Sequence, residues 1–424
     1  MKTSLDSKFS RRNLFKLLGV GATAALAPSL AMRTEAATIP HVIVVGGGFA
    51  GSTAAKYVKQ WGGQGVEVTL IEPNSSYVSP ILSNLVLNGQ RTTAGLSFGY
   101  QAQQNRGVNM INSSVTAINK SAQTVTLANG QTLSYSRLVL APGIDFDYVA
   151  GHDPSLVPHA WQAGTQTNLL KAQLDAMSSG QHFVMTIPAA PYRCPPGPYE
   201  RACVVADALN NARGLGATVT VLDANPGITV EADSFGARFE MYGINYIPNA
   251  VVTAVDSTNR IVTYQENGVT KSIDADVLNV IPNQKAGKII FDAGLNSGNW
   301  APVNPLSYES TLASNIHIIG DSQGTGQPKA GHIGNSEAKV CADAVLRLLN
   351  NLAPDPAPKT NSACYSPVSR TEATWLTALY EYNSTTRQMQ LVAGNNYPYA
   401  SAPSTRNYGD MFDWAGNLFN DTFS

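Results

Sequence analysis

The chain has 424 residues, of which 43% are hydrophobic and only 13% are charged, and its formal net charge is −1. This length allows two or three domains. The hydrophobic content excludes a disordered chain, and no basic run occurs beyond the N-terminus, so we expect no nucleic-acid partner.

The first 36 residues are interpreted as an export signal that is not part of the fold. Arg11-Arg12 stands in a twin-arginine pattern ahead of a weakly apolar stretch, and small-residue cleavage sites end at Ala31 or Ala36. The alternative is an uncleaved membrane anchor, but the stretch is shorter than the ~20 apolar residues that a span needs. We therefore expect a periplasmic protein whose mature part, with 22 basic and 27 acidic residues, has no transmembrane segment.

The mature chain opens with a strand–helix–strand unit. A nearly continuous apolar run over 39–45 predicts a buried parallel strand, a helix is expected over 52–61, and a second strand over 66–71. Between the first strand and the helix stands Gly-x-Gly-x-x-Gly, formed by Gly46, Gly48 and Gly51.

These glycines permit a tight turn, close approach of a pyrophosphate, and close packing of helix on strand. The phosphate charge meets free N–H groups at the helix N-terminus. Glu72, at the end of the second strand, is placed to accept hydrogen bonds from ribose hydroxyls. The unit is thus predicted to bind a dinucleotide.

The next elements follow in order. Short antiparallel strands are expected over 115–118, 124–127 and 131–135, with a hairpin turn at Asn129-Gly130, before 138–143 returns to the parallel sheet. A second unit is expected with a helix over 168–177, strands over 182–187 and 218–222, and a helix over 201–213; a β-rich stretch to residue 273 and a strand over 277–281 follow it. A strand over 316–321, a helix over 336–349, a proline-rich linker over 353–358 and an aromatic-rich third unit complete the chain.

The second unit has no glycine fingerprint after its first strand. The proline-rich stretch Pro188 to Pro198 stands there instead, and prolines remove N–H donors that a phosphate would need. We therefore reject NAD(P)H as the electron donor. Asp223, at the end of the next strand, is expected to be a solvated strand end rather than a ribose ligand.

Two later motifs identify the dinucleotide. The segment 311–321 ends in Gly320-Asp321 and resembles the late motif of two-dinucleotide flavoproteins, whose aspartate binds the ribityl chain of FAD. The segment 138–143 resembles their middle motif. The resemblance implies an α/β fold with two Rossmann-like domains of the disulfide-reductase flavoprotein type and a C-terminal α+β interface domain. The expected boundaries are 1–36 for the signal, 37–149 and 276–350 for the two parts of the FAD-binding domain, 150–275 for the second Rossmann-like domain and 351–424 for the C-terminal domain.

The chain has four cysteines, Cys194, Cys203, Cys341 and Cys364. Spacing alone does not choose among their three possible pairings. Because they form no Cys-x-x-Cys, we expect no structural zinc or iron–sulfur site and no haem attached to this chain. Cys203 and Cys341 stand at apolar helical spacing and are expected to be core residues.

The stretches Cys194 to Arg201 and Ala275 to Pro282, together with the FAD motifs, resemble the flavoprotein subunit of flavocytochrome c sulfide dehydrogenase, a relative of sulfide:quinone oxidoreductases. The resemblance covers about residues 40–424. It implies a redox-active disulfide between Cys194 and Cys364 beside the flavin, with Glu200 as a proton acceptor. Hydrosulfide would attack the disulfide, and electrons would pass through FAD to a c-type cytochrome whose haem is carried by a partner. A purely structural disulfide, and Glu200 as a helix-start acid, are the alternatives.

The chain departs from this family at one position. Pro80 occupies the place of the cysteine that commonly links FAD, so we expect non-covalent FAD. Lys329 resembles a family residue beside the flavin pyrimidine and would stabilise negative charge on the reduced ring, or is merely a solvated lysine. Trp414 and Phe412 would cover the active site, join a partner interface or belong to the core. The expected cofactor contacts are Gly46, Gly48, Phe49, Ala50, Gly51, Glu72, Pro80, Val115, Ala141, Gly143, Asp321 and Lys329.

Two other functions fit the same residues. A sulfide:quinone oxidoreductase would need an apolar membrane-facing patch, whereas acidic and amide residues interrupt the aromatic tail 408–424. A non-catalytic flavin electron carrier would leave the disulfide inert. Bleaching of the flavin by sulfide would separate the two enzymes from the carrier, and the subsequent addition of cytochrome c or quinone would separate the two enzymes from each other.

Overall fold

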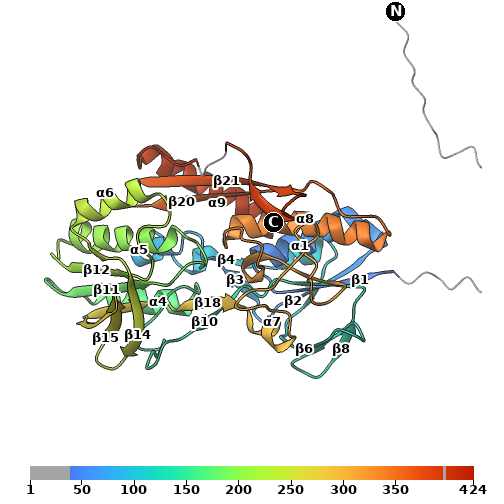
Figure 1. The fold of residues 1–424 in the computed structure, drawn as a ribbon, viewed down its shortest axis with the longest axis horizontal. Helices are drawn as coiled ribbons and strands as arrows, with labels where there is room; N and C mark the ends of the chain where they lie inside the picture. Colours follow the sequence, from blue (N-terminus) through green and yellow to red (C-terminus); the bar gives the residue numbers. More distant parts are fainter. Residues whose placement is uncertain (1–38, 395–397) are drawn as a thin grey trace, which may run out of the picture. The chain divides into compact units, whose positions relative to one another are not determined.

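The structure is a computed structural model, and it describes residues 39–394 and 398–424. The predicted export signal lies outside the described residues. Two parallel sheets lie side by side, and a C-terminal layer that includes β21 and α9 runs along the top of the view in Figure 1.

The first sheet is parallel throughout and has the strand order β19-β9-β1-β2-β5. Alternate residues of its strands face two different cores, as the pleat requires. Val42 and Val44 pack with Ala54 and Val345 of the covering helices α1 and α8, while Ile43 packs toward a three-stranded meander on the other face. The elements are β1 (His41–Val45), β2 (Glu67–Ile71), β5 (Asn109–Ile111), β9 (Arg137–Leu140), β19 (Ile316–Ile318), α1 (Phe49–Gly62), α8 (Gly331–Leu349) and the meander β6 (Val115–Asn119), β7 (Thr124–Leu127) and β8 (Thr132–Ser134).

The second sheet is also parallel, in the order β13-β12-β11-β17. Strand β17 completes this sheet, although we expected the FAD-binding domain to resume at residue 276. Helices cover one face of the sheet and an antiparallel meander covers the other. The elements are β11 (His182–Ile187), β12 (Thr218–Asp223), β13 (Asn245–Ile247), β17 (Val277–Val280), α4 (Thr165–Asp175), α5 (Gly197–Ala206), α6 (Ala232–Tyr242) and the meander β14 (Ala250–Asp256), β15 (Ile261–Glu266) and β16 (Val269–Asp274).

Helix α5 begins four residues earlier than we predicted. Pro198 lies in its first turn, where a missing N–H costs nothing because those groups have no partner within the helix. The helix continues into a π-helical turn at Asp207–Ala212. The early start brings Glu200 into the first turn of the helix and Cys194 close to its N-terminus.

Asp223 corrects the expectation of a solvated strand end. The residue is fully buried and its carboxylate accepts hydrogen bonds from Tyr199 Oη at 2.8 Å, from Tyr246 Oη at 2.7 Å and from the backbone N and side chain of Asn225. Tyrosine hydroxyls therefore take the hydrogen bonds that a nucleotide ribose would make at this position. The prediction was wrong because the sequence pattern around residue 223 indicates where the strand ends, but not which side chains pack over that end.

The C-terminal layer is a three-stranded antiparallel sheet followed by a long helix. Ser404 caps that helix by accepting a hydrogen bond from Asn407 N at 3.1 Å. Met411, Ala415 and Leu418 are buried at helical spacing and turn one face inward. The elements are β20 (Lys359–Pro367), β21 (Ala373–Asn383), β22 (Gln388–Leu391) and α9 (Thr405–Phe423).

Shorter elements join these layers. Strands β10 and β18 pair antiparallel and β3 pairs with β4. Their bounds, with those of the short helices and 3₁₀ turns, are η1 (Gly63–Gly65), β3 (Ser76–Val78), α2 (Asn84–Leu87), η2 (Ala94–Leu96), β4 (Ser97–Gly99), α3 (Gln101–Asn105), β10 (Ile144–Asp147), β18 (Asn283–Ala286), α7 (Lys288–Asp292) and η4 (Gly320–Ser322).

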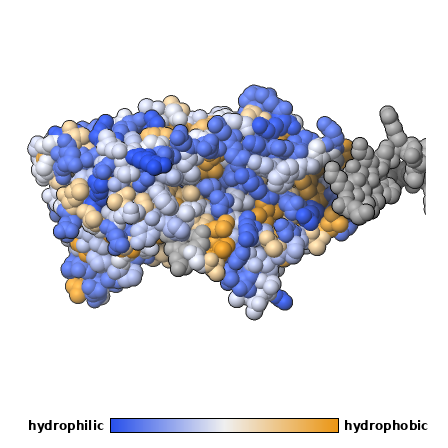
Figure 2. Space-filling view, turned by 90° about the horizontal axis from the view of Figure 1, so that it is seen from above, coloured by the Kyte–Doolittle hydropathy of each residue, from blue (hydrophilic) through white to orange (hydrophobic). Residues whose placement is uncertain are grey.

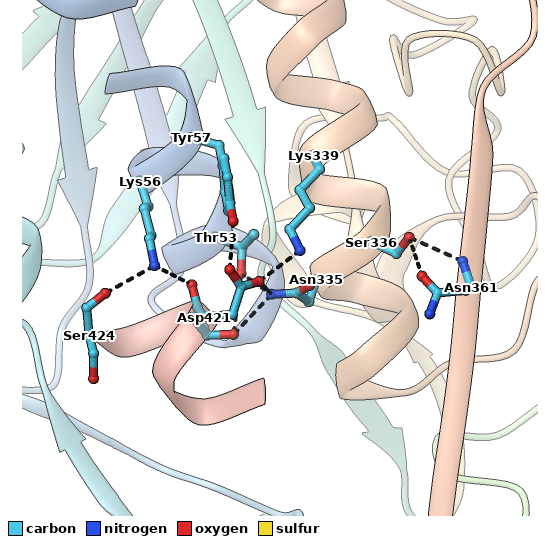
Figure 3. A network of polar contacts seen from close by, with 10 residues as sticks. Thr53, Lys56, Tyr57, Asn335, Ser336, Lys339, Asn361, Asp421 and Ser424 are labelled. Carbon is cyan, nitrogen blue, oxygen red and sulfur yellow. Dashed lines mark hydrogen bonds and ion pairs between the residues drawn. The ribbon is translucent and has the colours of Figure 1, made fainter. Parts of the chain in front are cut away.

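Asp421 fastens the end of α9 to the two helices of the FAD-binding half (Figure 3). Its carboxylate accepts hydrogen bonds from Tyr57 Oη at 2.5 Å and Asn335 Nδ2 at 2.8 Å, and pairs with Lys339 Nζ at 2.7 Å. Lys56 Nζ donates to the Asp421 carbonyl at 2.6 Å. These contacts hold the C-terminal layer over α1 and α8.

Replacing Asp421 by asparagine is expected to destabilise the protein by about 1 kcal/mol at pH 7. Burial alone would raise the pKa of Asp421, but Lys339, Tyr57 and Asn335 lower it to about 2. A depressed carboxyl pKa stabilises the fold above the unfolded pKa, and this contribution is lost as pH falls from about 4 to about 2. The effect is kept small because the side chain is 29% exposed and solvent screens it.

Urea unfolding at pH 7 and at pH 2.5 measures this difference. Asp413→Asn, an exposed position on the same helix, is the control and should match the wild type at both pH values. A loss of stability in Asp421→Asn that is equally large at pH 2.5 would contradict the ionic contribution.

Candidate active site: a dinucleotide cleft and an adjoining thiol pocket

A cleft of about 600 Å³ lies at the carboxyl ends of the strands of the first sheet. Of the residues that we predicted to contact the cofactor, all but Gly51 and Lys329 line this cleft. Most come from the turn after β1, the end of β2, the segment after β9 and the turn after β19, while Pro80 follows β3 and Val115 begins β6. The sheet thus gathers the three sequence motifs at one edge, as parallel strands require.

The glycines explain how the backbone makes room for a dinucleotide. Gly46 has φ +103°, and a Cβ there would stand 2.3 Å from the carbonyl oxygen of Ala141. Gly51 lies behind the cleft, where a Cβ would stand 1.8 Å from the carbonyl oxygen of Gly46. Gly51 therefore acts through packing: it lets α1 approach the turn whose backbone faces the cleft. This cradle and the cleft volume of about 600 Å³ fit FAD.

Two carboxylates stand at the ends of the cleft strands. Glu72 is oriented by Gly47 N, which donates to its Oε2 at 2.8 Å, and by Asn74 N, which donates to its Oε1 at 3.0 Å. Asp321 lines the cleft from the turn after β19. Burial raises the pKa of Asp321, while the charges of Arg193 and Lys329 oppose this.

Sequence reasoning missed the residue that holds the Asp321 turn. Glu337 of α8 is fully buried, and its two carboxyl oxygens accept hydrogen bonds from Gly320 N and Gln323 Nε2, both at 2.8 Å. Nothing in the sequence marks it, because its partners come from a turn that only the fold brings to α8.

Lys329 lies beside the cleft without lining it. Its Nζ donates to the carbonyl oxygen of Gln323 at 2.6 Å and stands 3.7 Å from the ring centroid of Trp300. Burial lowers the pKa of Lys329 to about 8. Of the two predicted roles, a solvated lysine is wrong, and charge stabilisation of the flavin stays a prediction.

A second, smaller pocket of about 70 Å³ adjoins the cleft. Pro80, Arg193, Ala330 and Gly331 line both cavities, so they form a shared wall. We call the smaller one the thiol pocket because Cys194 and Cys364 both line it. Two cysteines from distant parts of the chain therefore lie together beside the dinucleotide cleft, as the resemblance implied.

The loop before α5 holds Cys194 in a strained conformation. Cys194 has φ +57°, and its N–H donates to the Lys329 carbonyl oxygen at 2.7 Å. A Cβ on Gly197 would stand 2.8 Å from Cys194 Sγ, so only glycine leaves room for the sulfur.

Both sulfurs of the thiol pocket are buried. Burial raises the pKa of Cys194 to about 12, against the opposing charge of Arg193. Burial and then the charge of Cys194 raise the pKa of Cys364. All four cysteines are thiols in this structure, and Cys203 and Cys341 lie fully buried in separate cores, as predicted.

Glu200 faces the thiol pocket from the first turn of α5. Its Oε1 accepts a hydrogen bond from Asn84 Nδ2 at 2.9 Å. Burial raises the pKa of Glu200 to about 8, against the opposing effects of Asn84 and Arg201. A carboxyl with such a pKa gains and loses a proton near neutral pH, as a general base must.

The pocket walls contain three further polar residues that sequence reasoning missed as functional. Arg201, at the end of the Cys194 to Arg201 motif, is buried and donates to Asn84 Oδ1 at 3.0 Å and to the Ala160 carbonyl oxygen at 2.6 Å. Arg193 lines both cavities, and its guanidinium makes no hydrogen bond or ion pair with the residues that the structure describes. His332 Nδ1 accepts hydrogen bonds from Ala363 N at 3.0 Å and Trp414 Nε1 at 3.3 Å.

Of the two aromatic residues that we expected over the site, only one lines the thiol pocket. Trp414 lines the thiol pocket from α9. Phe412 stacks against the guanidinium of Arg91, 4.4 Å from its ring centroid. Trp414 therefore covers the site, whereas Phe412 packs away from it.

Comparison with known proteins finds a family match for each of two adjacent parts of the chain. Residues 167–282, which include the Cys194 loop, match the family described as the central part of the sulfide dehydrogenase [flavocytochrome c] flavoprotein chain. Residues 40–159 match the pyridine nucleotide-disulphide oxidoreductase family. The sulfide dehydrogenase [flavocytochrome c] flavoprotein chain of Chlorobaculum thiosulfatiphilum is 44% identical over 46 residues, which are 94% of that sequence and 11% of this chain.

More distant relatives share the fold. Rubredoxin-NAD(+) reductase of Pseudomonas putida is 22% identical over 66% of this chain and 71% of its own length. The sulfide:quinone oxidoreductase of Aquifex aeolicus superposes with a TM-score of 0.76 at 18% identity, over 91% of this chain and 92% of that one. Putidaredoxin reductase, in its covalent complex with putidaredoxin, superposes with a TM-score of 0.63 at 17% identity, over 90% and 93%.

These matches confirm the predicted fold of two dinucleotide-binding domains and identify an FAD-dependent flavoprotein oxidoreductase. The two family matches together include the glycine turn, Glu72, the segment after β9 and the Cys194 loop, and they end before the turn that carries Asp321. The chain therefore belongs to the family of flavoprotein chains of flavocytochrome c sulfide dehydrogenase.

Proposed function

We propose that the chain is a periplasmic FAD-dependent sulfide dehydrogenase that oxidises hydrosulfide to polysulfide or sulfur and passes the electrons to a c-type cytochrome. The observation that carries this proposal is the shared wall between the dinucleotide cleft and a buried pocket containing two cysteines. Export by the twin-arginine route is part of the proposal and rests on Arg11-Arg12.

In the oxidised enzyme, Cys194 and Cys364 form a disulfide. Hydrosulfide attacks one sulfur, a new S–S bond makes a persulfide, and the bond between the cysteines breaks. The other sulfur leaves with the electron pair and takes up a proton, because a buried thiolate is unfavourable where the pKa of Cys194 is about 12. A second hydrosulfide attacks the persulfide, so that disulfide anion (HSS⁻) leaves and the attacked cysteine becomes a thiol.

The two thiols then re-form the disulfide, releasing two protons and two electrons. The glycine turn, Glu72 and Asp321 would hold FAD, which would supply the two-electron acceptor. Glu200, which lines the pocket beside both sulfurs, takes a proton as the thiols are oxidised. The charge of Arg193 attracts the hydrosulfide anion and opposes the burial penalty on the Cys194 thiolate.

The structure of the second Rossmann-like domain supports sulfide rather than a nicotinamide as donor. The hydrogen bonds from Tyr199 and Tyr246 occupy Asp223, the residue at the ribose position. The loop after β11 carries prolines where a pyrophosphate would need free N–H groups.

The surface supports a cytochrome rather than a membrane quinone as acceptor. The face seen in Figure 2, on the side of β21 and α9, is mostly hydrophilic with separated hydrophobic patches. No helix within residues 39–394 and 398–424 is both long enough and apolar enough to cross a bilayer, a finding that bears equally on either acceptor.

Anaerobic titration with sulfide tests the proposal. Sulfide should bleach the flavin absorbance without NAD(P)H, and added cytochrome c should restore it faster than a soluble quinone does. Restoration by quinone alone would favour a sulfide:quinone oxidoreductase. A flavin that sulfide does not bleach would overturn the enzyme function in favour of a non-catalytic carrier.

We expect FAD to be bound non-covalently. Pro80 lines the cleft at the position where the family commonly has a linking cysteine, and none of the described residues that line the cleft is a cysteine. Acid precipitation of the purified protein should release all of the flavin into the supernatant, as measured by absorbance. Yellow colour that remains with the washed pellet would show a covalent bond.

A further inference from the structure

Sulfide oxidation by two buried thiols moves protons as well as electrons. In the proposed cycle the pocket takes up one proton when the disulfide opens and releases two when it re-forms. Glu200 lines the pocket but is itself 7% exposed, so it cannot pass protons freely to water. The buried polar groups behind it therefore decide how protons leave.

The sheet β20–β21 extends the thiol pocket toward a second carboxyl. Cys364 and Ser366 are two residues apart on β20 and share one face of the sheet. Thr374 of β21 stands directly opposite Ser366 and shares that face. Thr374 Oγ1 donates a hydrogen bond of 2.7 Å to Glu231 Oε1. Ser366 itself lines the thiol pocket, so polar side chains lead from the pocket to Glu231.

Glu231 is an unusual residue for a helix start. It is 6% exposed and adopts the left-handed conformation, with φ 50° and ψ 40°, although it is not a glycine. Its side chain makes no cap for α6. The structure therefore holds this carboxyl inward at a cost in backbone strain, which is typical of functional positions.

Two buried oxygen atoms in this cluster, Glu231 Oε2 and Ser366 Oγ, make no hydrogen bond of good geometry among the described residues. The Ser366 hydroxyl nevertheless lies near enough to Glu200 to lower the pKa of that carboxyl, against the larger effect of burial. An unsatisfied buried polar atom costs about 1–3 kcal/mol, so evolution rarely leaves two of them together. A carboxyl oxygen and a hydroxyl of this kind are suited to accept and donate a proton.

We propose that Glu231 is a second proton station, which exchanges protons between Glu200 at the thiol pocket and solvent through the hydroxyl of Ser366. The proposal rests on the proposed sulfide oxidation. Glu231 touches neither sulfide nor flavin, so it acts on the reaction through Glu200. Ala232 and Asp233, the next residues in the chain, are exposed, so the station stands directly beneath the surface.

The charges around Glu231 agree with this assignment. Glu200 on α5 and Cys364 on β20 are the titratable groups that face it from neighbouring elements, and its charge raises the pKa of both, after the larger effect of burial. On its own helix, Arg238 pairs with Glu372 at 2.9 Å, and so leaves Glu231 without a cation. Burial raises the pKa of Glu231 to about 7, against the effect of Thr374, and the pKa of Glu200 is about 8. Burial therefore shifts both carboxyls to exchange protons near neutral pH.

Stopped-flow measurement of flavin reduction by sulfide, from pH 6 to pH 9 without oxygen, tests the proposal. In the wild type the limiting rate should rise with pH, because both carboxyls must lose a proton before they accept one from the thiols. Glu231→Gln should lower this rate at least about tenfold and remove the lower step of the pH profile. Ser366→Ala should lower it in the same direction.

Three controls separate a proton station from a structural role. Glu231→Asp keeps an ionisable carboxyl and should restore most of the rate and the pH dependence. Glu240→Gln, an exposed carboxyl on the same helix, should leave both unchanged. Reduction by dithionite, which needs no thiols, should proceed at the wild-type rate in every variant.

The outcomes distinguish this proposal from the one it rests on. A wild-type protein that sulfide does not bleach refutes the proposed function and the proton path with it. A wild type that is bleached, with Glu231→Gln and Ser366→Ala equally fast over the whole pH range, refutes the proton path alone. If Glu231→Gln does not fold, Ser366→Ala and Glu231→Asp decide the question.

Discussion

Replacing Cys194 by serine is expected to lower the rate of flavin reduction by sulfide at least about a thousandfold while FAD remains bound. A serine hydroxyl fills nearly the same volume in the thiol pocket, but it forms neither the disulfide nor the persulfide. Cys194 lies in the thiol pocket and is absent from the lining of the cleft, so the cofactor keeps its contacts. Stopped-flow bleaching of the flavin measures the rate, and the ratio of flavin to protein absorbance measures the FAD content.

Cys364→Ser should lose as much activity as Cys194→Ser, and the double variant should lose no more than either single one. Residues that act as one unit show such non-additivity. Cys341→Ala, a fully buried thiol in the core of the first sheet, is the control and should keep the wild-type rate. A Cys194→Ser enzyme that sulfide still bleaches within tenfold of the wild-type rate would eliminate the disulfide mechanism.

The second large effect concerns the cofactor. Gly51→Ala is expected to weaken FAD binding at least about a hundredfold, which corresponds to about 3 kcal/mol. Its Cβ would stand 1.8 Å from the carbonyl oxygen of Gly46, a backbone atom that cannot rotate away. Either α1 or the turn at Gly46 must shift, and that turn is the one that faces the pyrophosphate.

Isothermal titration of the apoprotein with FAD measures this change. Gly65→Ala is the control, because a Cβ there meets nothing within 4 Å and should leave the affinity unchanged. Far-UV circular dichroism shows whether Gly51→Ala is folded before FAD is added. An FAD affinity like that of the wild type in a folded Gly51→Ala protein would contradict the role of this close packing.

The cleft could be predicted from the sequence because its parts are local. Gly46, Gly48 and Glu72 act through the backbone turn and strand end in which they stand, and each lines the cleft as predicted. The resemblance supplied the pairing of Cys194 with Cys364, which spacing alone left open. Both cysteines line one pocket in the structure.

Other residues could not be assigned without the tertiary structure. The sequence predicts that Asp223 stands at a free strand end, whereas in the structure the hydroxyls of Tyr199 and Tyr246 hydrogen-bond to it. In the sequence, nothing distinguishes Glu231 from any acidic residue before a helix. The register of β20 against β21 places Thr374, which donates a hydrogen bond to Glu231, opposite Ser366 of the thiol pocket.

The sequence by itself therefore determined the dinucleotide turn, the order of the strands along the chain and the absence of a second glycine fingerprint. These features depend on residues close together in the chain, whose backbone preferences act locally. Only the tertiary structure decided which carboxyls are buried, which cation lines the thiol pocket and which helix covers that pocket. Burial and electrostatic effects depend on neighbours that lie far apart in sequence, so no local pattern contains them.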